Sequence, residues 1–237
     1  MKLSVKLFTF LACFTFNDIA FSRPVSIVYR ADSRAPSDVF SNGFHAWGTN
    51  INFNSHVLGI SGRRGSRDSA FIPTTSSSNS ANRFAIDLLN VSEDRTSYTY
   101  SIRATNNFYS ALDSMYHVYD TAGVRVPELT RATLAAEQEY SAYQHIPAQL
   151  IQSVTITSRA DNGSLITRVE ENPNYAPDTT HSNEDPFTYG LPYPINISPI
   201  LIMGSSMANI NNEMPNNSAI LPSPSYTLSS LMAHSEL

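Results

Sequence analysis

The chain has 237 residues and a formal net charge of −5 at pH 7, and hydrophobic residues make up 41% of it. This composition allows one domain with an apolar core, and the negative balance argues against nucleic-acid binding, which ordinarily needs a basic surface. The only cysteine, Cys13, lies in an apolar N-terminal stretch. The rest of the chain can therefore form neither a disulfide nor a thiolate metal site.

The N-terminal residues have the pattern of a secretory leader. A positive start precedes an apolar run from Leu7 to Phe16, and Ala20, Phe21 and Ser22 form a small-residue cleavage region. We expect residues 1–22 to be removed on export. No later stretch is long and apolar enough for a transmembrane helix, so we expect a secreted protein with no stable membrane insertion.

The body of the chain has the patterns of strands and helices in irregular order. The expected elements up to the middle of the chain are a strand at 25–30, a helical turn around 39–40 ended by Asn42-Gly43, a polar loop at 56–68, a short strand at 71–72, and a helix over 81–89 capped by the serines at 76–80. The later ones are a strand at 98–102, a loop at 106–109, a helix from Pro127 to 136, and a hairpin of 151–157 and 165–169. This mixture predicts an α+β fold.

The composition changes after Glu171. Residues 172–237 are rich in proline, asparagine and serine and contain only short apolar patches. We therefore expect a catalytic domain over 23–171, followed by an extended or weakly helical segment over 172–237 that needs a partner to become ordered.

Three features of the body could carry chemistry. Glu137 and Glu139 are two residues apart, and their carboxylates would point to the same side of an extended segment, where they could bind sugar hydroxyls and stabilise a developing cation. A pair of this kind is also common on solvated surfaces. Arg30 closes the first strand and could bind a phosphate. The stretch from 69 to 78 is rich in hydroxyls that could position a carboxylate or a ligand amide.

Four blocks of sequence, in order, resemble the family of the pertussis and cholera toxin catalytic subunits. They are Tyr29-Arg30-Ala31-Asp32-Ser33-Arg34 with Trp47-Gly48 after it, Ser69-Ala70-Phe71-Ile72-Pro73-Thr74-Thr75-Ser76, Arg103-Ala104-Thr105-Asn106-Asn107-Phe108-Tyr109, and Glu137-Gln138-Glu139-Tyr140. The blocks span most of residues 25–160. The resemblance implies the ADP-ribosyltransferase toxin fold and a mono-ADP-ribosyltransferase that uses NAD as its substrate and needs no metal.

The resemblance also implies roles for individual residues. Glu139 would stabilise the ribosyl cation and bind the ribose 2′-hydroxyl, and Glu137 would orient or deprotonate the acceptor. His56 would assist catalysis. Arg30 would hold the NAD phosphates. The other residues expected to contact NAD are Tyr29, for which packing is the commoner role, and Thr74 and Thr75.

Two positions depart from the family pattern. Where the family has Ser-Thr-Ser, this chain has Pro73-Thr74-Thr75, so the first hydroxyl is absent, as it is in the typhoid toxin relative with Ala-Thr-Thr. Either Thr74 or Thr75 could supply the missing hydroxyl. Relatives also carry a cysteine near the position of Gly62 that closes a reducible disulfide. This chain cannot form that bond, so we expect no activation by reduction.

The resemblance extends to partners and delivery. We expect a heterotrimeric G-protein α subunit as the acceptor protein, with the modified residue open, and a pentamer of B subunits as the delivery partner. The final His234-Ser235-Glu236-Leu237 resembles an endoplasmic-reticulum retrieval signal. Two alternatives stay open: an NAD glycohydrolase that transfers to water, and a non-catalytic binding module with the toxin fold.

Overall fold

The computed structural model describes residues 22–62, 65–92 and 95–189. In these residues the strands form one seven-stranded sheet, in the order β5-β6-β3-β1-β4-β8-β9, and a separate two-stranded ribbon of β2 and β7. The leader run and the His234–Leu237 tetrapeptide lie outside these residues. The strands are β1 Ile27–Asp32, β2 Phe44–His45, β3 Phe71–Thr75, β4 Thr96–Arg103, β5 Phe108–Ser110, β6 Glu139–Tyr143, β7 His145–Ile146, β8 Ile151–Arg159 and β9 Leu165–Glu171. The helices are α1 Pro36–Asn42, α2 Phe53–Val57, α3 Ser78–Val91, α4 Ala111–Thr121 and α5 Glu128–Glu137, with a 3₁₀ turn η1 at Ala148–Leu150.

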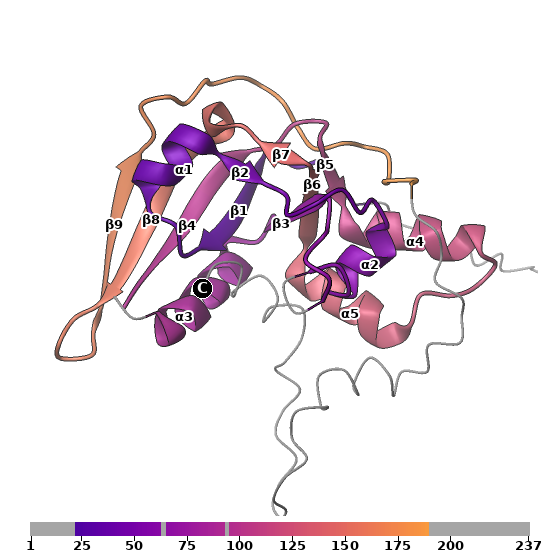
Figure 1. The fold of residues 1–237 in the computed structure, drawn as a ribbon, viewed down its shortest axis with the longest axis horizontal. Coiled ribbons are helices and arrows are strands. Elements are labelled where there is room, and N and C mark those ends of the chain that lie inside the picture. The colour runs from indigo at the N-terminus through magenta and orange to yellow at the C-terminus, as the bar shows by residue number, and fades with distance from the viewer. Residues whose placement is uncertain (1–21, 63–64, 93–94, 190–237) are drawn as a thin grey trace, which may run out of the picture.

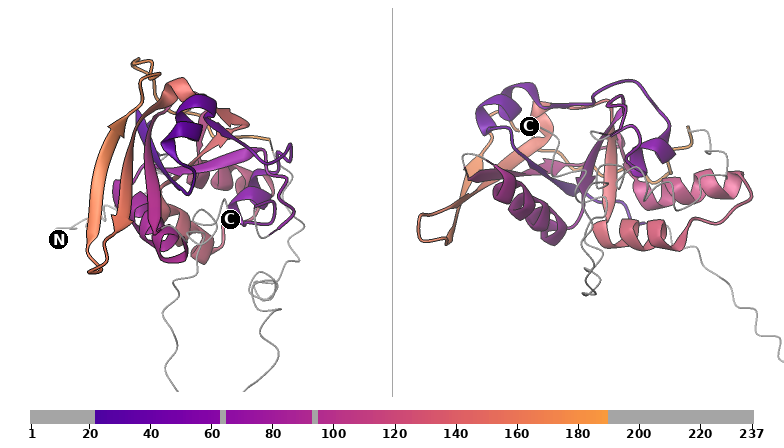
Figure 2. Two further views of the ribbon diagram at one scale, coloured as in Figure 1. Left: turned by 60° about the vertical axis from the view of Figure 1, so that its left-hand side comes forward. Right: turned by 60° about the horizontal axis from the view of Figure 1, so that its bottom comes forward.

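The large sheet consists of two blocks that meet at a single residue pair. Strands β1, β4, β8 and β9 form one antiparallel block, and β3, β6 and β5 form the other. Only Tyr29 and Thr75 pair across the junction between β1 and β3. Figure 1 shows the two blocks side by side, with the projecting β8–β9 hairpin at one end of the molecule and α4 and α5 at the other; Figure 2 shows the same arrangement from two further sides.

Each block packs against its own helices. Within the four-stranded block, alternate strand residues face opposite sides of the sheet. Val28 of β1 packs with residues of α1, β4 and β8 in the largest apolar cluster, whereas Ala31 of the same strand packs with Phe84, Ala85 and Leu88 of α3. A second cluster joins β3 to α2, α4 and α5. Helices α1 and α3 therefore pack on opposite faces of the four-stranded block.

Several local signals act as the sequence predicts. The Ser77 hydroxyl accepts the Ser80 amide at 3.2 Å and caps α3, and Pro127 is the residue before the first turn of α5. Gly43 ends α1 with φ 70°, and Gly163 turns the β8–β9 hairpin with φ 84°. Both angles lie in the left-handed region that glycine adopts without steric strain.

Several elements lie where the sequence indicated loops or no element at all, among them β2, β6, β7 and η1. Helix α2 extends to the second residue of the predicted polar loop, and β5 begins inside the predicted loop at 106–109 and leads directly into α4. These elements are short or closely joined, so they carry too few residues for a clear periodicity. A local signal for α4 does exist, because the Ser110 hydroxyl accepts the Asp113 amide at 3.2 Å.

The described part of the segment after β9 lies against the body without a partner chain. The Asn172 amide donates to the carbonyls of Ala148 and Ile151 at 2.9 and 2.8 Å. Ser182 is fully buried, and Phe187, 9% exposed, packs in the apolar cluster of the three-stranded block. We propose that the folded domain extends to Phe187 rather than ending at residue 171. Among the described helices, none is long and apolar enough to span a bilayer.

Candidate active site

The two glutamates lie on either side of a left-handed turn. Glu137 is the last residue of α5 and Glu139 the first of β6, while Gln138 between them has φ 50° and ψ 46°. The condition under which the two carboxylates would share one side of a strand is therefore not met, because the helix continues to Glu137 and Gln138 adopts a left-handed conformation. Both carboxylates are buried, with 4% of each residue exposed. They are not a pair on a solvated surface.

The carboxylate of Glu139 lies in a buried polar cluster with His56 and Ser141. The Ser141 hydroxyl donates to Glu139 Oε1 at 2.7 Å, and His56 Nε2 lies 3.3 Å from the same oxygen and 3.1 Å from the Ser141 hydroxyl. Residues 139 and 141 share a face of β6 by strand alternation. The structure thus brings together two residues that are 83 positions apart in the chain, His56 and Glu139.

His56 is held firmly on a short helix. Helix α2 is capped by Asn52, whose side chain accepts the Ser55 amide at 3.2 Å, and all of its residues are buried. The rings of Phe53 and Phe71 lie 6.0 and 5.2 Å from the imidazole. His56 Nδ1 lies 2.9 Å from the hydroxyl of Ser69. These buried contacts therefore hold the His56 side chain in place, and His56 does not lie in a solvated loop.

The hydrogen-bond pattern favours one arrangement of protons around His56. Because the Ser141 hydroxyl donates to Glu139, it must accept from His56, so Nε2 carries a proton. In the neutral imidazole, Nδ1 then accepts from the Ser69 hydroxyl. The same Nε2–H faces the Glu139 carboxylate, which places a donor beside a buried anion.

The Thr75 hydroxyl links β3 to the turn formed by residues 137–139, which is called the glutamate turn below. Its hydroxyl donates to the carbonyl of Glu137 at 2.6 Å and accepts the Ser77 amide at 3.0 Å. Thr75 also stands opposite Glu139 in β6 and opposite Tyr29 in β1, so these three residues form one row across the sheet. Tyr29 is partly buried at the end of this row.

Thr74 faces the other side of β3. It is fully buried, and its hydroxyl donates to the carbonyl of Tyr140. Because successive strand residues point to opposite faces, Thr74 and Thr75 cannot both line the face that carries Glu139. The geometry favours Thr75 as the hydroxyl next to the glutamates.

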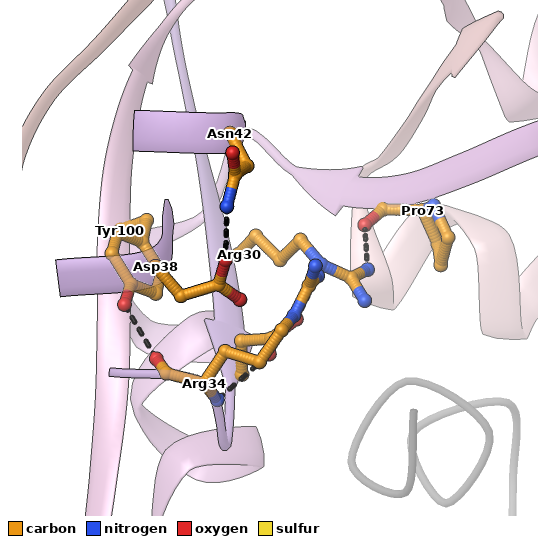
Figure 3. A network of polar contacts seen from close by, with 7 residues as sticks. Arg30, Arg34, Asp38, Asn42, Pro73 and Tyr100 are labelled. Atoms are coloured by element: carbon orange, nitrogen blue, oxygen red, sulfur yellow. Dashed lines mark hydrogen bonds and ion pairs between the residues drawn. The ribbon is translucent and has the colours of Figure 1, made fainter. Parts of the chain in front are cut away.

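Arg30 is buried in a network that spans the junction of the two sheet blocks (Figure 3). Its Nε donates to Asp32 at 3.0 Å, and its Nη1 donates to the carbonyl of Pro73 at 2.8 Å. Arg34 also binds Asp32, through its backbone N–H and its guanidinium. The guanidiniums of both arginines lie near the ring of Phe44, at 5.2 and 4.8 Å from its centroid.

The electrostatics of this network centre on Asp32. Burial would raise the pKa of this carboxyl, but the positive charges of Arg30 and Arg34 outweigh burial and hold the pKa below its usual value. Nearby, burial and then the Asp32 charge raise the pKa of the Tyr100 phenol, whose hydroxyl donates to the Arg34 carbonyl. The arginines are therefore fixed by a fully buried anion on β1.

A cavity of about 330 Å³ lies next to the glutamate turn, and Ser76, Gln138 and Glu139 are among its lining residues. Together, a buried carboxylate that accepts from Ser141 and faces His56, a second carboxylate two residues away and a buried arginine suit chemistry in which positive charge develops near Glu139. Among the described residues, no group of three histidine, cysteine or acidic side chains could hold a metal ion.

The sequence missed two members of this cluster. Ser141 lies two residues after Glu139, and a strand reading of β6 would have placed the two side chains on one face. Asp32 lies two residues after Arg30 in the same way. Ser69 belongs to the hydroxyl-rich stretch that the sequence did indicate, but its partner, His56, comes from a separate helix that no local pattern connects to it.

Comparisons with known proteins identify relatives of this chain. The family model described as "Pertussis toxin, subunit 1" matches residues 23–191. Pertussis toxin subunit 1 of Bordetella pertussis is 36% identical over 177 residues, which are 70% of this chain and 66% of the relative. The ADP-ribosylating toxin CARDS of Mycoplasma pneumoniae is 28% identical over 222 residues, which are 79% of this chain and 36% of the relative.

Solved structures show the same fold. The structure named EcPltA is 30% identical, with a TM-score of 0.61, and the match covers 70% of this chain and 97% of that one. Full-length CARDS toxin is 26% identical, with a TM-score of 0.54 and coverage of 69% and 31%. The expected α+β fold of ADP-ribosyltransferase toxins is thus confirmed. The chain spans just under two thirds of the pertussis subunit's length, and over that span it belongs to the family of pertussis toxin subunit 1.

Proposed function

We propose that the chain is the catalytic subunit of a secreted toxin that transfers ADP-ribose from NAD to a host protein and releases nicotinamide. The observation that carries this proposal is the buried Glu139 carboxylate, held by Ser141 and facing His56. Membership of the pertussis toxin subunit 1 family and the relation to an ADP-ribosylating toxin support it.

The chemistry begins at the bond between nicotinamide and ribose in NAD. When it breaks, nicotinamide leaves with the bonding electrons, and positive charge develops on the ribose. Glu139 stabilises this charge and accepts a hydrogen bond from the ribose 2′-hydroxyl. Ser141 and His56 fix the direction of the carboxylate, so that it does not have to reorganise during the reaction.

Glu137 serves the second half of the reaction. An acceptor nucleophile on the host protein attacks the ribosyl cation, and Glu137 orients it or takes up its proton. Thr75 holds this part of the site through the carbonyl of Glu137. Because a carboxylate suits a guanidinium as well as other acceptors, the modified residue stays open among cysteine, arginine, asparagine and lysine.

Arg30 and Tyr29 act on the remainder of NAD. We propose that Arg30 contributes to phosphate binding and also holds β1 to β3 through the Pro73 carbonyl, and that Tyr29, at the end of the row with Thr75 and Glu139, contacts NAD. We also propose that the acceptor protein is a heterotrimeric G-protein α subunit and that a B-subunit pentamer delivers the chain. In the same proposal, the leader directs export of the chain and the final tetrapeptide directs its retrieval to the endoplasmic reticulum.

The test is incubation of the chain from residue 23 onward with labelled NAD and a host-cell lysate, beside a Glu139→Ala control. A labelled band near the mass of a G-protein α subunit that is lost in the variant supports the proposal. NAD consumption without a labelled band would point instead to an NAD glycohydrolase. Absence of any NAD turnover would leave a binding module with the toxin fold.

A further inference from the structure

Asp113, in the first turn of α4, is a buried carboxylate with little to neutralise it. The residue is 4% exposed. Oδ2 accepts the backbone N–H of Ser22 at 2.9 Å, and Oδ1 has no hydrogen-bond partner in the described part of the chain. Among the residues that the structure describes, none forms an ion pair with Asp113. A buried carboxylate with one neutral donor is unfavourable, since buried charges are ordinarily paired with an opposite charge.

The surroundings of Asp113 show where an additional cation would fit. The Ser110 hydroxyl donates to the Ser22 hydroxyl at 3.0 Å, and the Tyr140 hydroxyl donates to the Arg23 carbonyl at 2.8 Å. Ser22, Arg23 and Ser110 also line the cavity of about 330 Å³ beside the glutamate turn. Burial first, and the negative charge of Asp113 second, raise the pKa of the Tyr140 phenol. The Ser22–Arg23 segment thus lies beside the negative charge of Asp113.

The sequence supplies a cation at this place. In Ala20-Phe21-Ser22, small residues stand at the first and third positions, which is the pattern that a leader peptidase cleaves after the third. Hydrolysis of the peptide bond between Ser22 and Arg23 adds water, leaves a carboxylate on the departing leader, and leaves an α-ammonium on Arg23. The cut also removes the Ser22 N–H and hydroxyl from Asp113 and Ser110.

We propose that the α-ammonium of the processed chain binds the carboxylate of Asp113. This inference rests on the proposed leader but not on the proposed transferase activity. The nitrogen of Arg23 is one residue from the nitrogen that already lies 2.9 Å from Oδ2, so a small rotation at the free end brings it into place. The ammonium has three donors and a full charge, and can therefore satisfy both oxygens, where the peptide N–H satisfies one.

The chain around the new terminus is held in position. The Arg23 carbonyl is fixed by Tyr140, and the Val25 amide donates to the Ser182 hydroxyl at 3.0 Å. Ser110 pairs with Tyr140 between β5 and β6, next to Glu139 at the start of the same strand. Removal of the leader therefore adds an ion pair beside the strand that carries the catalytic glutamate, and the exported form becomes more stable than its precursor.

The test is a double-mutant cycle measured by thermal unfolding. Protein that begins at Arg23, released from a fusion partner without an extra residue, is compared with the same protein acetylated at its α-amine, each with and without Asp113→Asn. Acetylation removes the positive charge and adds no residue. We expect acetylation to lower the melting temperature by at least about 3 °C in the Asp113 protein and by less than about 1 °C in the D113N protein. Equal shifts in both backgrounds would overturn the proposal.

A matched control and a second measurement complete the test. Asp120→Asn changes an exposed aspartate of the same helix, and we expect acetylation of the α-amine to have its full effect in that background. If D113N does not fold, carbamylation of the α-amine by cyanate is compared in folded and urea-unfolded protein that begins at Arg23. At least about tenfold slower reaction in the folded protein supports the ion pair, and equal rates contradict it. Exported protein that begins downstream of Arg23 would also overturn it.

Discussion

The cluster of Glu139, His56 and Ser141 makes a direct prediction for Ser141→Ala. Ser141 is fully buried and cannot touch the substrate, so its effect must pass through the Glu139 carboxylate that it holds at 2.7 Å. A hydrogen bond to a charged group contributes about 1.5–3 kcal/mol, and about 1.4 kcal/mol corresponds to a tenfold change in rate. We therefore expect kcat for nicotinamide release from NAD to fall by about 10-fold to 100-fold, with KM changed less than about twofold.

The control for this prediction is Ser97→Ala. Ser97 is also a fully buried strand serine, on β4, but no described residue forms a hydrogen bond with its hydroxyl. The two substitutions remove the same atom from similar surroundings, and only one of them removes a contact with the site. We expect S97A to keep wild-type kcat and to be as stable as the wild type or more so.

Kinetics and thermal unfolding of both variants separate the site from the fold. Loss of the Ser141 hydrogen bonds lowers the melting temperature by about 2–4 °C for each kcal/mol, so the assay is run well below that range. If S141A is fully folded at the assay temperature and its kcat stays within about threefold of the wild type, Ser141 does not orient Glu139, and the proposed role of the cluster is incorrect.

Four further substitutions test the remainder of the site. The first is Asp32→Asn: because the wild-type carboxyl has a lowered pKa in the folded state, it stabilises the fold above the unfolded pKa, near 4, and this stabilisation is lost as pH falls through the folded pKa. In urea unfolding between pH 3 and 7, we therefore expect the free energy of unfolding to fall less steeply toward low pH in the variant than in the wild type. Thr75→Val and Thr74→Val should both lower the melting temperature, by about 2–8 °C, since each loses a buried hydrogen bond, but only T75V should also lower NAD turnover at equal folding. Arg30→Lys should lower kcat/KM for NAD at least about tenfold, because one ammonium cannot serve both Asp32 and the β3 carbonyl in the geometry of the guanidinium.

Much of the fold follows from local patterns in the sequence. The β1, β3, α3, β4 and α5 elements and the β8–β9 hairpin correspond to predicted elements, because periodicity, caps and glycine turns act over a few neighbouring residues. The sheet order does not follow from such patterns. That β1 lies between β3 and β4 and meets β3 at one pair depends on contacts between residues more than 40 positions apart.

The candidate site shows the same division. Arg30, His56 and Glu139 were indicated by the family resemblance, and their types suit the proposed chemistry. Their burial and partners were not indicated, since His56 meets Ser141 only after α2 packs against β6. The backbone conformation between the two glutamates could not be predicted, because a spacing of two residues does not distinguish a strand from a helix end followed by a left-handed residue.

The missing serine at position 73 can be understood from the atoms that the structure uses there. Pro73 contributes its backbone carbonyl to Arg30 at 2.8 Å, and any residue could supply this group. The hydroxyl that reaches the glutamate turn comes from Thr75, which binds the carbonyl of Glu137. Gln138, in a conformation that costs a non-glycine residue about 1 kcal/mol or more, is held by the Ser76 amide, which donates to its carbonyl at 3.0 Å. The strand therefore fixes the two glutamates through Thr75 and Ser76, and a proline two residues earlier removes no contact on which they depend.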